Sequence, residues 1–381
     1  MEEVFVIGGD HHNTLGVIRA LGYRDIKSNV ILVTSNKYPY VGYSKYIKNK
    51  YIVSNDDRAI DLLKKLVTEC HHPIVIACSD SSSSAIDQNR DELIQYYSLP
   101  GSSIQGRITE NMNKERMREI ASRVGLLTPL SWVVQKGESL DHILFPCITK
   151  PLLSKEGNKT DICICSNRGE LENAISRGSC EKYQIQFFIE KEYEYQLIGL
   201  SIKEGHDVVI PGLSRCIRPC PGTNTGFLHY ESLEGKNIPI QNCKEYIREI
   251  GYSGLFSMEF IRGTDGNDYF LEINFRNDGN AICVTKSGIN LPYMWCLANE
   301  GLNYKEELNI CKLKPTYVMP EFDDFRCFVL TRKITIKQWL ADIKRTDAFM
   351  EYDNLDLLPF WCGVFNLLLA KIQRGISNRT R

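Results

Sequence analysis

The sequence predicts an α/β domain followed by an α+β body that contains antiparallel sheets. The first sign is a series of short apolar runs alternating with helical patterns over residues 4–80. The second is a long strand-rich stretch at 183–203, followed by a hairpin pattern at 254–275. Strands that alternate with helices are typical of a parallel sheet, and strands joined by a tight turn are typical of an antiparallel one. The 381 residues, 43% hydrophobic and 24% charged, suit a globular protein of two or three subdomains.

Charge and cysteine content narrow the class of protein. The net charge is −1, so no overall positive field attracts nucleic acid, and no nucleic-acid partner is expected. The 14 cysteines include no C-x-x-C pair, and the chain opens on a strand pattern without a signal-like apolar region. These features predict a cytoplasmic protein with reduced thiols.

The α/β domain is expected to span residues 1–105. Asp80 falls at the carboxyl end of a strand, and His11 lies in the loop after the first strand. Open α/β sheets bind ligands at this edge, so both are candidate substrate contacts, with a loop or cap role as the alternative for His11. The expected elements are strand 4–9, helix 13–22, strand 29–35, helix 57–69 and strand 73–80.

A polar segment at 98–112, rich in Ser and Gly, is predicted to be a linker. The helix that begins at Asn167 carries Glu170 three residues later, which is a capping-box arrangement. The other elements expected after the linker are helix 113–125, strands 131–135, 146–151 and 161–165, and a charged loop at 152–160.

The hairpin at 254–275 carries the most specific chemistry. Glu259 lies on its first strand, and Glu272, Asn274 and Arg276 alternate along its second. Alternate residues of a strand share one face, so two carboxylates and an amide oxygen converge there. Such oxygen ligands suit Mg²⁺, and a cation would relieve the repulsion between the carboxylates. Arg276 could pair with a phosphate or carboxylate; a solvated strand face is the alternative interpretation.

Two lysines upstream support a phosphate site. Lys114 opens a helix, and Lys150 ends a strand just before the charged loop. Lysines at element ends, beside a flexible loop, would compensate the charge of a triphosphate.

The lysines and the metal hairpin together resemble the ATP-grasp superfamily, over nearly the whole chain. The segments "GGDHHNTLGVIRALG", "GYSKYIKNKYIVS", "CSDSSSSAIDQNRDEL", "KQWLADIK" and "YDNLDLLPF" are similar to those of D-aspartate-ligase-like and carbamoyl-phosphate-synthase-like members. The resemblance implies a Rossmann-like pre-ATP-grasp domain followed by two α+β subdomains that hold a nucleotide between them. The implied boundaries are 106–183 for the small subdomain, 184–305 for the large one and 306–381 for a C-terminal region.

The resemblance also implies roles for single residues. Glu259, Glu272 and Asn274 would hold two Mg²⁺ ions, which Mn²⁺ could replace. Arg276 and Lys150 would be catalytic. The phosphates of the nucleotide would contact Lys114, Lys150 and either Lys155 or Lys159 of the charged loop. The adenine would contact Gln186 and the backbone of Ile189. The ribose would contact Glu192, with Glu194 as the alternative.

The implied function is an ATP- and Mg²⁺-dependent ligase that activates a carboxylate as an acyl phosphate and joins it to an amine. A carboxylase or carbamoyl-phosphate-type enzyme is one alternative, and a nucleotide-binding scaffold without catalysis is another. Arg215, Arg218 and Asp278 are further candidate substrate contacts, with surface arginines and a polar turn as the competing interpretations. Together with the segment 357–381, the two arginines hint at an acidic substrate and at work near the cell envelope, as in ligases that act on cell-wall or capsule polysaccharide precursors.

The C-terminal segment 357–381 begins with an apolar run interrupted by Pro359, Gly363 and Asn366. This run is too short to span a bilayer, which takes about 20 residues. Two interpretations stay open: a helix docked on its own protein, or a helix on a membrane surface with its basic tail against anionic headgroups. A homodimer is also open.

Overall fold

The computed structural model describes the chain except residues 1, 68–71, 153–160, 222–224, 311–312 and 378–381. Side chains of residues 309–310 and 370–377 are also not described. Lys155 and Lys159, the candidate loop lysines, therefore lie outside the described residues.

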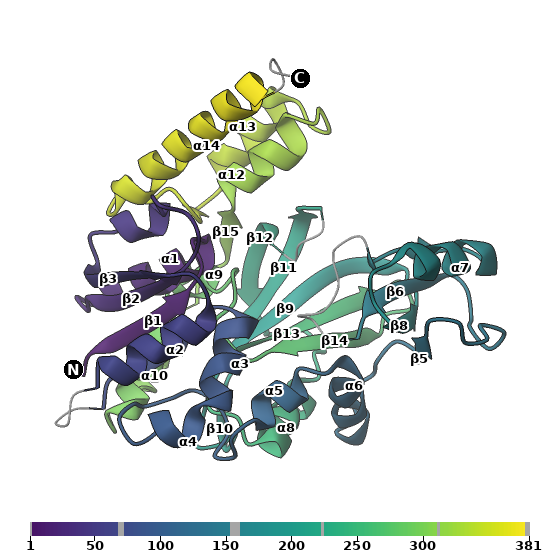
Figure 1. Ribbon diagram of the computed structural model, residues 1–381, viewed down its shortest axis with the longest axis horizontal. Helices are drawn as coiled ribbons and strands as arrows, with labels where there is room; N and C mark the ends of the chain where they lie inside the picture. The colour runs from purple at the N-terminus through teal and green to yellow at the C-terminus, as the bar shows by residue number, and fades with distance from the viewer. Residues whose placement is uncertain (1, 68–71, 153–160, 222–224, 311–312, 378–381) are drawn as a thin grey trace.

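The first domain is the predicted parallel α/β unit, with strand order β3-β2-β1-β4 (Figure 1). Three of its strands are almost fully buried runs, which is why their positions were readable from the sequence. The edge strand β3 contains only exposed and half-buried residues, among them the exposed polar run 48–50, so it had no long apolar run to reveal it. The elements are β1 Val4–Gly8, α1 His12–Gly22, β2 Ser28–Val33, β3 Ile47–Val53, α2 Asp56–Lys65, β4 Ile74–Ala77, α3 Asp80–Gln88 and α4 Arg90–Leu93.

A large, mostly antiparallel sheet forms the body, in the order β14-β13-β9-β11-β12-β15-β16, with β10 paired to β9. The last pair, β15 with β16, is parallel. The strands are β9 Lys191–Ile202, β10 Asp207–Val209, β11 Gly212–Pro219, β12 Gly226–Ser232, β13 Gly254–Gly263, β14 Asp268–Asn274, β15 Thr316–Met319 and β16 Ala348–Phe349.

A separate small sheet, β5-β8-β6-β7, carries one helix and stands apart from the first domain (Figure 1). Its elements are β5 Ser131–Gln135, β6 Cys147–Pro151, β7 Ile164–Cys165, α7 Arg168–Arg177 and β8 Lys182–Phe187. The strand-rich stretch 183–203 is therefore two strands, β8 and β9, that belong to different sheets.

Helices cover both faces of the large sheet. On one face, α5 Arg107–Asn111, α6 Lys114–Arg123 and α8 Ile240–Ile250 bury Ile108, Met117 and Tyr246 against sheet residues such as Phe256. On the other face, α9 Ile282–Lys286 and α10 Leu291–Asn299 lie in one continuous core with the first domain. The remaining helices are α11 Glu306–Ile310, α12 Glu321–Asp324, α13 Ile336–Arg345 and α14 Leu357–Ser377.

Two expectations about chain organisation need adjustment. The predicted linker 98–112 contains helix α5, whose residue Ile108 is fully buried, so this segment is part of the body. The boundary expected at 183/184 falls inside β8, and the region after residue 305 adds β15 and β16 to the large sheet. Among the described helices, none is long and apolar enough to cross a membrane.

A buried arginine fastens the C-terminal region to the first domain. Arg19 of α1 is 1% exposed, and its Nε lies 3.1 Å from Asp356 Oδ2. Its two terminal nitrogens donate to the carbonyls of Met350, Glu351 and Asp356 at 2.9–3.2 Å. The carboxylate of Asp356 also accepts from Ser44 Oγ at 2.8 Å. One guanidinium thus supplies the polar partners of a buried turn that leads into α14.

Arg19→Met is expected to lower the free energy of unfolding by about 3–5 kcal/mol, because it leaves the Asp356 carboxylate buried without a counter-charge. Urea denaturation would measure the loss, and limited proteolysis should release the segment after Met350 more readily. The control is Arg58→Met, which removes an exposed arginine paired with Asp61 and should cost about 1 kcal/mol or less. Equal stability of both variants would contradict the proposed stabilising role of Arg19.

Candidate active site

A cleft of about 660 Å³ lies between the small sheet and strands β9, β13 and β14 of the large sheet. One part of its wall is apolar and contains Ile148, Ile162, Ile164, Phe187, Ile261 and Leu271. The other part is polar and contains Lys114, Lys150, Gln186, Glu194, Glu259 and Glu272. The backbone of Ile189 belongs to the segment between β8 and β9 that also borders the cleft. The structure thus brings six of the candidate residues from the sequence analysis to the wall of one cavity: Lys114, Lys150, Gln186, Ile189, Glu259 and Glu272.

The two glutamates stand directly opposite each other, because β13 and β14 pair Glu259 with Glu272. Residues directly opposite on antiparallel strands have Cβ atoms only about 4.5–5.5 Å apart, so their like charges must be compensated. Asn274 Nδ2 donates to Glu259 Oε1 at 3.0 Å, and Gln196 Nε2 approaches the same oxygen at 3.4 Å. The protein thus meets one of the two charges with amide donors.

Lysines meet the other charge. Lys114 Nζ lies 3.2 Å from Glu272 Oε2, and this cation is the main reason that the pKa of Glu272 is held below its ordinary value. Lys150 Nζ donates to Gln186 Oε1 at 2.8 Å. Burial, reinforced by the charge of Lys114, lowers the pKa of Lys150 to about 8. The cleft therefore concentrates cations that an anionic ligand would stabilise.

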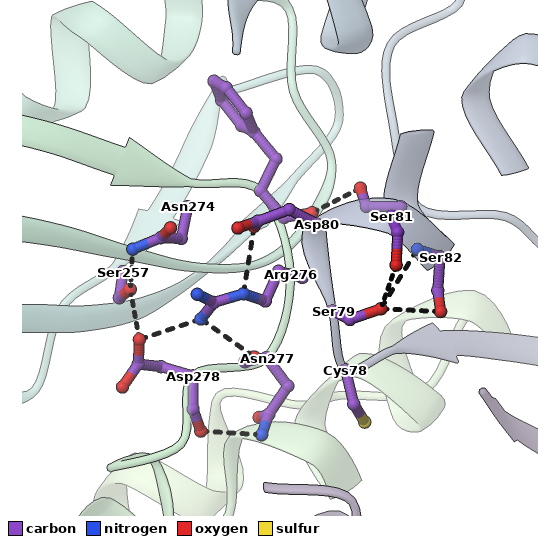
Figure 2. Close-up of polar contacts among 12 residues, drawn as sticks. Cys78, Ser79, Asp80, Ser81, Ser82, Ser257, Asn274, Arg276, Asn277 and Asp278 are labelled. Carbon is purple, nitrogen blue, oxygen red and sulfur yellow. Dashed lines mark hydrogen bonds and ion pairs between the residues drawn. The ribbon is translucent and has the colours of Figure 1, made fainter. Parts of the chain in front are cut away.

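Arg276 does not continue the strand face, as the alternating pattern had suggested. Strand β14 ends at Asn274, and the chain then carries Arg276 toward the first domain. Its Nε lies 3.1 Å from Asp80 Oδ1, and its Nη1 lies 2.9 Å from Asp278 Oδ2 (Figure 2). Although burial opposes the charge, these two carboxylates raise the pKa of Arg276 above its ordinary value. Arg276 therefore joins the large sheet to the edge of the first domain where Asp80 was expected to bind a ligand.

The residues after Arg276 are held by a buried hydrogen-bond network. Ser257 Oγ donates to Asp278 Oδ2 at 2.8 Å (Figure 2), and Asn280 Nδ2 donates to Gln196 Oε1 at 2.6 Å. Asn13 of α1 donates from Nδ2 to the carbonyl of Asn277 at 2.8 Å. The network links this loop to Glu259 through Gln196 and to the first domain through Asn13. Asp278 positions Arg276 instead of lying open at a pocket wall.

A second cavity, of about 550 Å³, adjoins this polar cluster and has Asn274 and Asp80 in its wall. The rest of its wall comes from α2, α3, α5 and α6 and includes Asp56, Ser84 and Met117. Glu259 thus lies in the wall of the cleft, and Asn274, whose amide contacts Glu259, lies in the wall of the second cavity.

Four other sequence candidates lie elsewhere. Glu192 is exposed and is not part of the cleft wall, whereas Glu194 is. Arg218 is bound by Asp324 at 2.8 Å and Asp342 at 2.6 Å, so its charge is used within the protein. Arg215 lies over the ring of Tyr193 at 5.5 Å. His11 accepts from the backbone N–H of Asn13 at 3.3 Å through Nδ1 and so caps α1, the alternative that the sequence left open.

Sequence reasoning missed Gln196, Ser257 and Lys191. Gln196 and Ser257 touch the carboxylates of Glu259 and Asp278, and Lys191 lies in the cleft wall. Gln196 stands two residues after Glu194 on β9, so the period of the strand could have placed it on the same face. Ser257 gave no such signal, because a lone serine in an apolar run reveals no partner.

The donor set suits a magnesium ion. No group of three His, Cys, Asp or Glu side chains able to hold a metal exists among the described residues. The candidate ligands are instead the two carboxylates of Glu259 and Glu272 and, as the third, the side-chain amide of Asn274. This set suits Mg²⁺, which is usually held by one or two carboxylates together with substrate phosphates. Asn274 now turns its nitrogen toward Glu259. Ligation through its oxygen would require a half-turn of the amide group.

No protein-family model matches the chain. Two relatives are formate-dependent phosphoribosylglycinamide formyltransferases. That of Bacteroides thetaiotaomicron is 25% identical over 231 residues, 55% of this chain and 56% of the relative. That of Bacteroides fragilis is 26% identical over 187 residues, 44% of this chain and 46% of the relative. The chain thus spans about half the length of these relatives.

Solved structures match over more of the chain. The L-amino acid ligase from Bacillus licheniformis is 16% identical with a TM-score of 0.65, covering 83% of this chain and 78% of the ligase. The biotin carboxylase domain of Hydrogenobacter thermophilus 2-oxoglutarate carboxylase, in complex with MgADP, ADP and bicarbonate, is 19% identical with a TM-score of 0.63. That match covers 83% of this chain and 74% of the domain. With its parallel first domain, its large antiparallel sheet and these structural matches, the chain has the fold of the ATP-grasp superfamily.

Proposed function

We propose that the protein is an ATP- and Mg²⁺-dependent ligase that activates a carboxylate and joins it to an amine. The observation that carries this proposal is the polar wall of the cleft. There the carboxylates of Glu259 and Glu272 face each other, and Lys114 and Lys150 stand beside them, next to an apolar wall. Paired carboxylates with neighbouring cations suit a metal-bound polyphosphate, and the apolar wall suits an aromatic base.

The cleft supports an assignment of the nucleotide contacts. Adenine would lie against Ile148, Phe187 and Leu271, with Gln186 and the Ile189 backbone at its polar edge. We assign the ribose to Glu194 in place of Glu192, because only Glu194 belongs to the cleft wall. Lys114 and Lys150 would lie on the phosphates.

Glu259, Glu272 and Asn274 would hold the magnesium, as two ions in this proposal. When bound, Mg²⁺ would neutralise charge on the phosphate oxygens and hold them in place. The residues of the chain would provide the rest. Lys114 would leave Glu272 for a phosphate, and Gln196 would keep Glu259 oriented through the contact at 3.4 Å.

Arg276 is the proposed group for the negative charge that develops when the carboxylate is activated and the amine attacks. Its guanidinium is held between Asp80 and Asp278, and Asp80 is part of the wall of the second cavity. A fixed cation at a partly buried position stabilises such charge without having to reorient. Asp80 and Asp278 would be positioning residues for Arg276.

The names of similar proteins support the choice of substrate classes. One structural match is an L-amino acid ligase, and the relatives in sequence act with formate, a carboxylate, on phosphoribosylglycinamide. Another structural match binds bicarbonate together with MgADP, so a carboxylase-type reaction is the second candidate. The two candidates differ in whether an amine or bicarbonate is required for turnover.

The deciding experiment is an ADP-release assay with Mg²⁺ over a panel of organic acids and amino acids, each offered with and without an amine. Release that needs both a carboxylate and an amine, with an amide product seen by mass spectrometry, is expected. Release that needs bicarbonate and no other acid would point to the carboxylase-type candidate. Tight ATP binding without turnover over the panel would point to a nucleotide-binding scaffold.

Glu272→Gln is expected to reduce Mg²⁺-dependent ADP release on the order of a hundredfold or more, because it removes one of the two metal-binding carboxylates. The fold should persist, which thermal unfolding would check. Glu119→Gln, an exposed glutamate paired only with Arg116 among the described residues, is the matched control and should keep full activity. Unaltered activity in Glu272→Gln would contradict the assignment of Glu272 as a metal ligand.

Lys150 gives a pH dependence. Its pKa of about 8 in the free protein lies below its ordinary value, so its charge is present below pH 8 and is lost above it. Phosphate binding favours the charged form, and the affinity for MgADP should therefore fall by up to about tenfold per pH unit above pH 8. Calorimetry in buffers of different ionisation enthalpy should show proton uptake near pH 8.5.

Lys150→Met should bind MgADP more weakly and lose this proton uptake. Lys182→Met, at an exposed position on neighbouring strand β8, should retain it. Proton uptake that survives in Lys150→Met would assign the titration to another group.

A further inference from the structure

Over residues 357–369, whose side chains the structure describes, the C-terminal helix α14 packs on its own protein through one side. Phe360 stacks on Phe322 with ring centroids 5.2 Å apart, and a Cβ on Gly363 would lie 2.7 Å from the Phe322 ring. Asn366 Nδ2 donates to the carbonyl of Tyr38 at 3.0 Å. The helix runs along the outside of the molecule, next to the first domain (Figure 1). The docked-helix interpretation of the sequence thus accounts for the inner side of α14.

The outer side of α14 is apolar and exposed. Leu358, Trp361, Phe365 and Leu368 are 60%, 59%, 60% and 55% exposed, and their spacing of three, four and three residues puts them on one stripe. Leu357 and Leu369 border this stripe and are also exposed. A water-facing helix surface normally carries polar residues, and a contiguous apolar patch marks a surface that binds a partner or a membrane.

The part of the first domain that α14 packs against carries exposed aromatic and basic residues. Helix α14 packs against the short 3-10 helix η1 Tyr40–Tyr43. Tyr38, just before η1, and Tyr43, at its end, are exposed, and Lys37 and Lys50 lie over their rings at 5.6 Å and 5.1 Å. The sequence beyond Leu369 contains Lys371, Arg374, Arg379 and Arg381 and no acidic residue. Tryptophan, tyrosine and leucine beside basic residues match the chemistry of an anionic lipid surface, with rings at the headgroup level and cations against phosphates.

We propose that the outer stripe of α14 binds the surface of an anionic lipid bilayer, with the helix lying parallel to the membrane plane. The apolar side chains would enter the boundary between headgroups and acyl chains, and the basic residues in the sequence after Leu369 would add electrostatic attraction to an anionic membrane. The proposal does not depend on the proposed ligase activity.

The test is flotation of the full-length protein with vesicles of phosphatidylcholine alone and of phosphatidylcholine with 30% phosphatidylglycerol. Binding to the anionic vesicles, weakened by salt, is expected. The double variant Trp361→Ser/Phe365→Ser should bind about tenfold more weakly or worse, because two large apolar side chains no longer insert. Lys371→Gln/Arg374→Gln should weaken binding to anionic vesicles, and the remaining binding should depend less on the salt concentration.

The matched control is Ile104→Ser/Leu144→Ser, which removes two apolar side chains of similar exposure, 54% and 53%, from other parts of the surface. It should bind vesicles as the wild type does. Thermal unfolding and MgADP affinity should be equal in all variants, which separates lost binding from lost folding. Absence of wild-type flotation, or equal flotation of Trp361→Ser/Phe365→Ser, would overturn the proposal. A wild-type dimer that this variant dissociates, without vesicle binding, would overturn it in favour of a second copy of the chain.

Discussion

Two carboxylates on adjacent strands repel each other, and many of the residues of the candidate site compensate that repulsion. Glu259 and Glu272 are fixed opposite each other by the register of β13 and β14. The protein places Lys114 against one and the amides of Asn274 and Gln196 against the other. Removing a charged pair from water is costly unless each charge has a partner, so the helix α6 and the strands β14 and β9, which supply these partners, are constrained together.

This constraint extends across the domain boundary. Gln196 receives a hydrogen bond from Asn280, and the loop that contains Asn280 also holds Asn277 and Asp278. Asn13 of the first domain binds the carbonyl of Asn277, and Asp80 of the first domain binds Arg276. The position of the first domain is thus coupled to the geometry of the carboxylate pair through a chain of buried polar contacts. In the proposed ligase, this coupling would keep a second substrate at a fixed place relative to the nucleotide.

The C-terminal region is held to the rest of the protein by few polar contacts. One buried guanidinium, that of Arg19, satisfies the backbone of the turn before α14, and α14 itself contacts the body through Phe360, Gly363 and Asn366. A helix held in this way leaves one side uncovered over residues 357–369, and that side is apolar. Binding at a membrane surface would therefore need no rearrangement of the domains that carry the cleft.

The sequence by itself determined the parallel first domain, the hairpin and the residue types of the site, because buried strands and alternating polar residues leave a local periodic pattern. It placed Lys114, Lys150, Gln186, Glu259 and Glu272 together through a family resemblance, and these residues do line one cleft. Only the tertiary structure decided the neighbours of Arg276, Arg218 and Glu192. Arg276 turns away after the end of β14 toward Asp80, Arg218 is bound by two carboxylates from the C-terminal region, and Glu192 faces solvent. Such pairings join residues more than a hundred positions apart, and local periodicity carries no information about which distant charge will meet which.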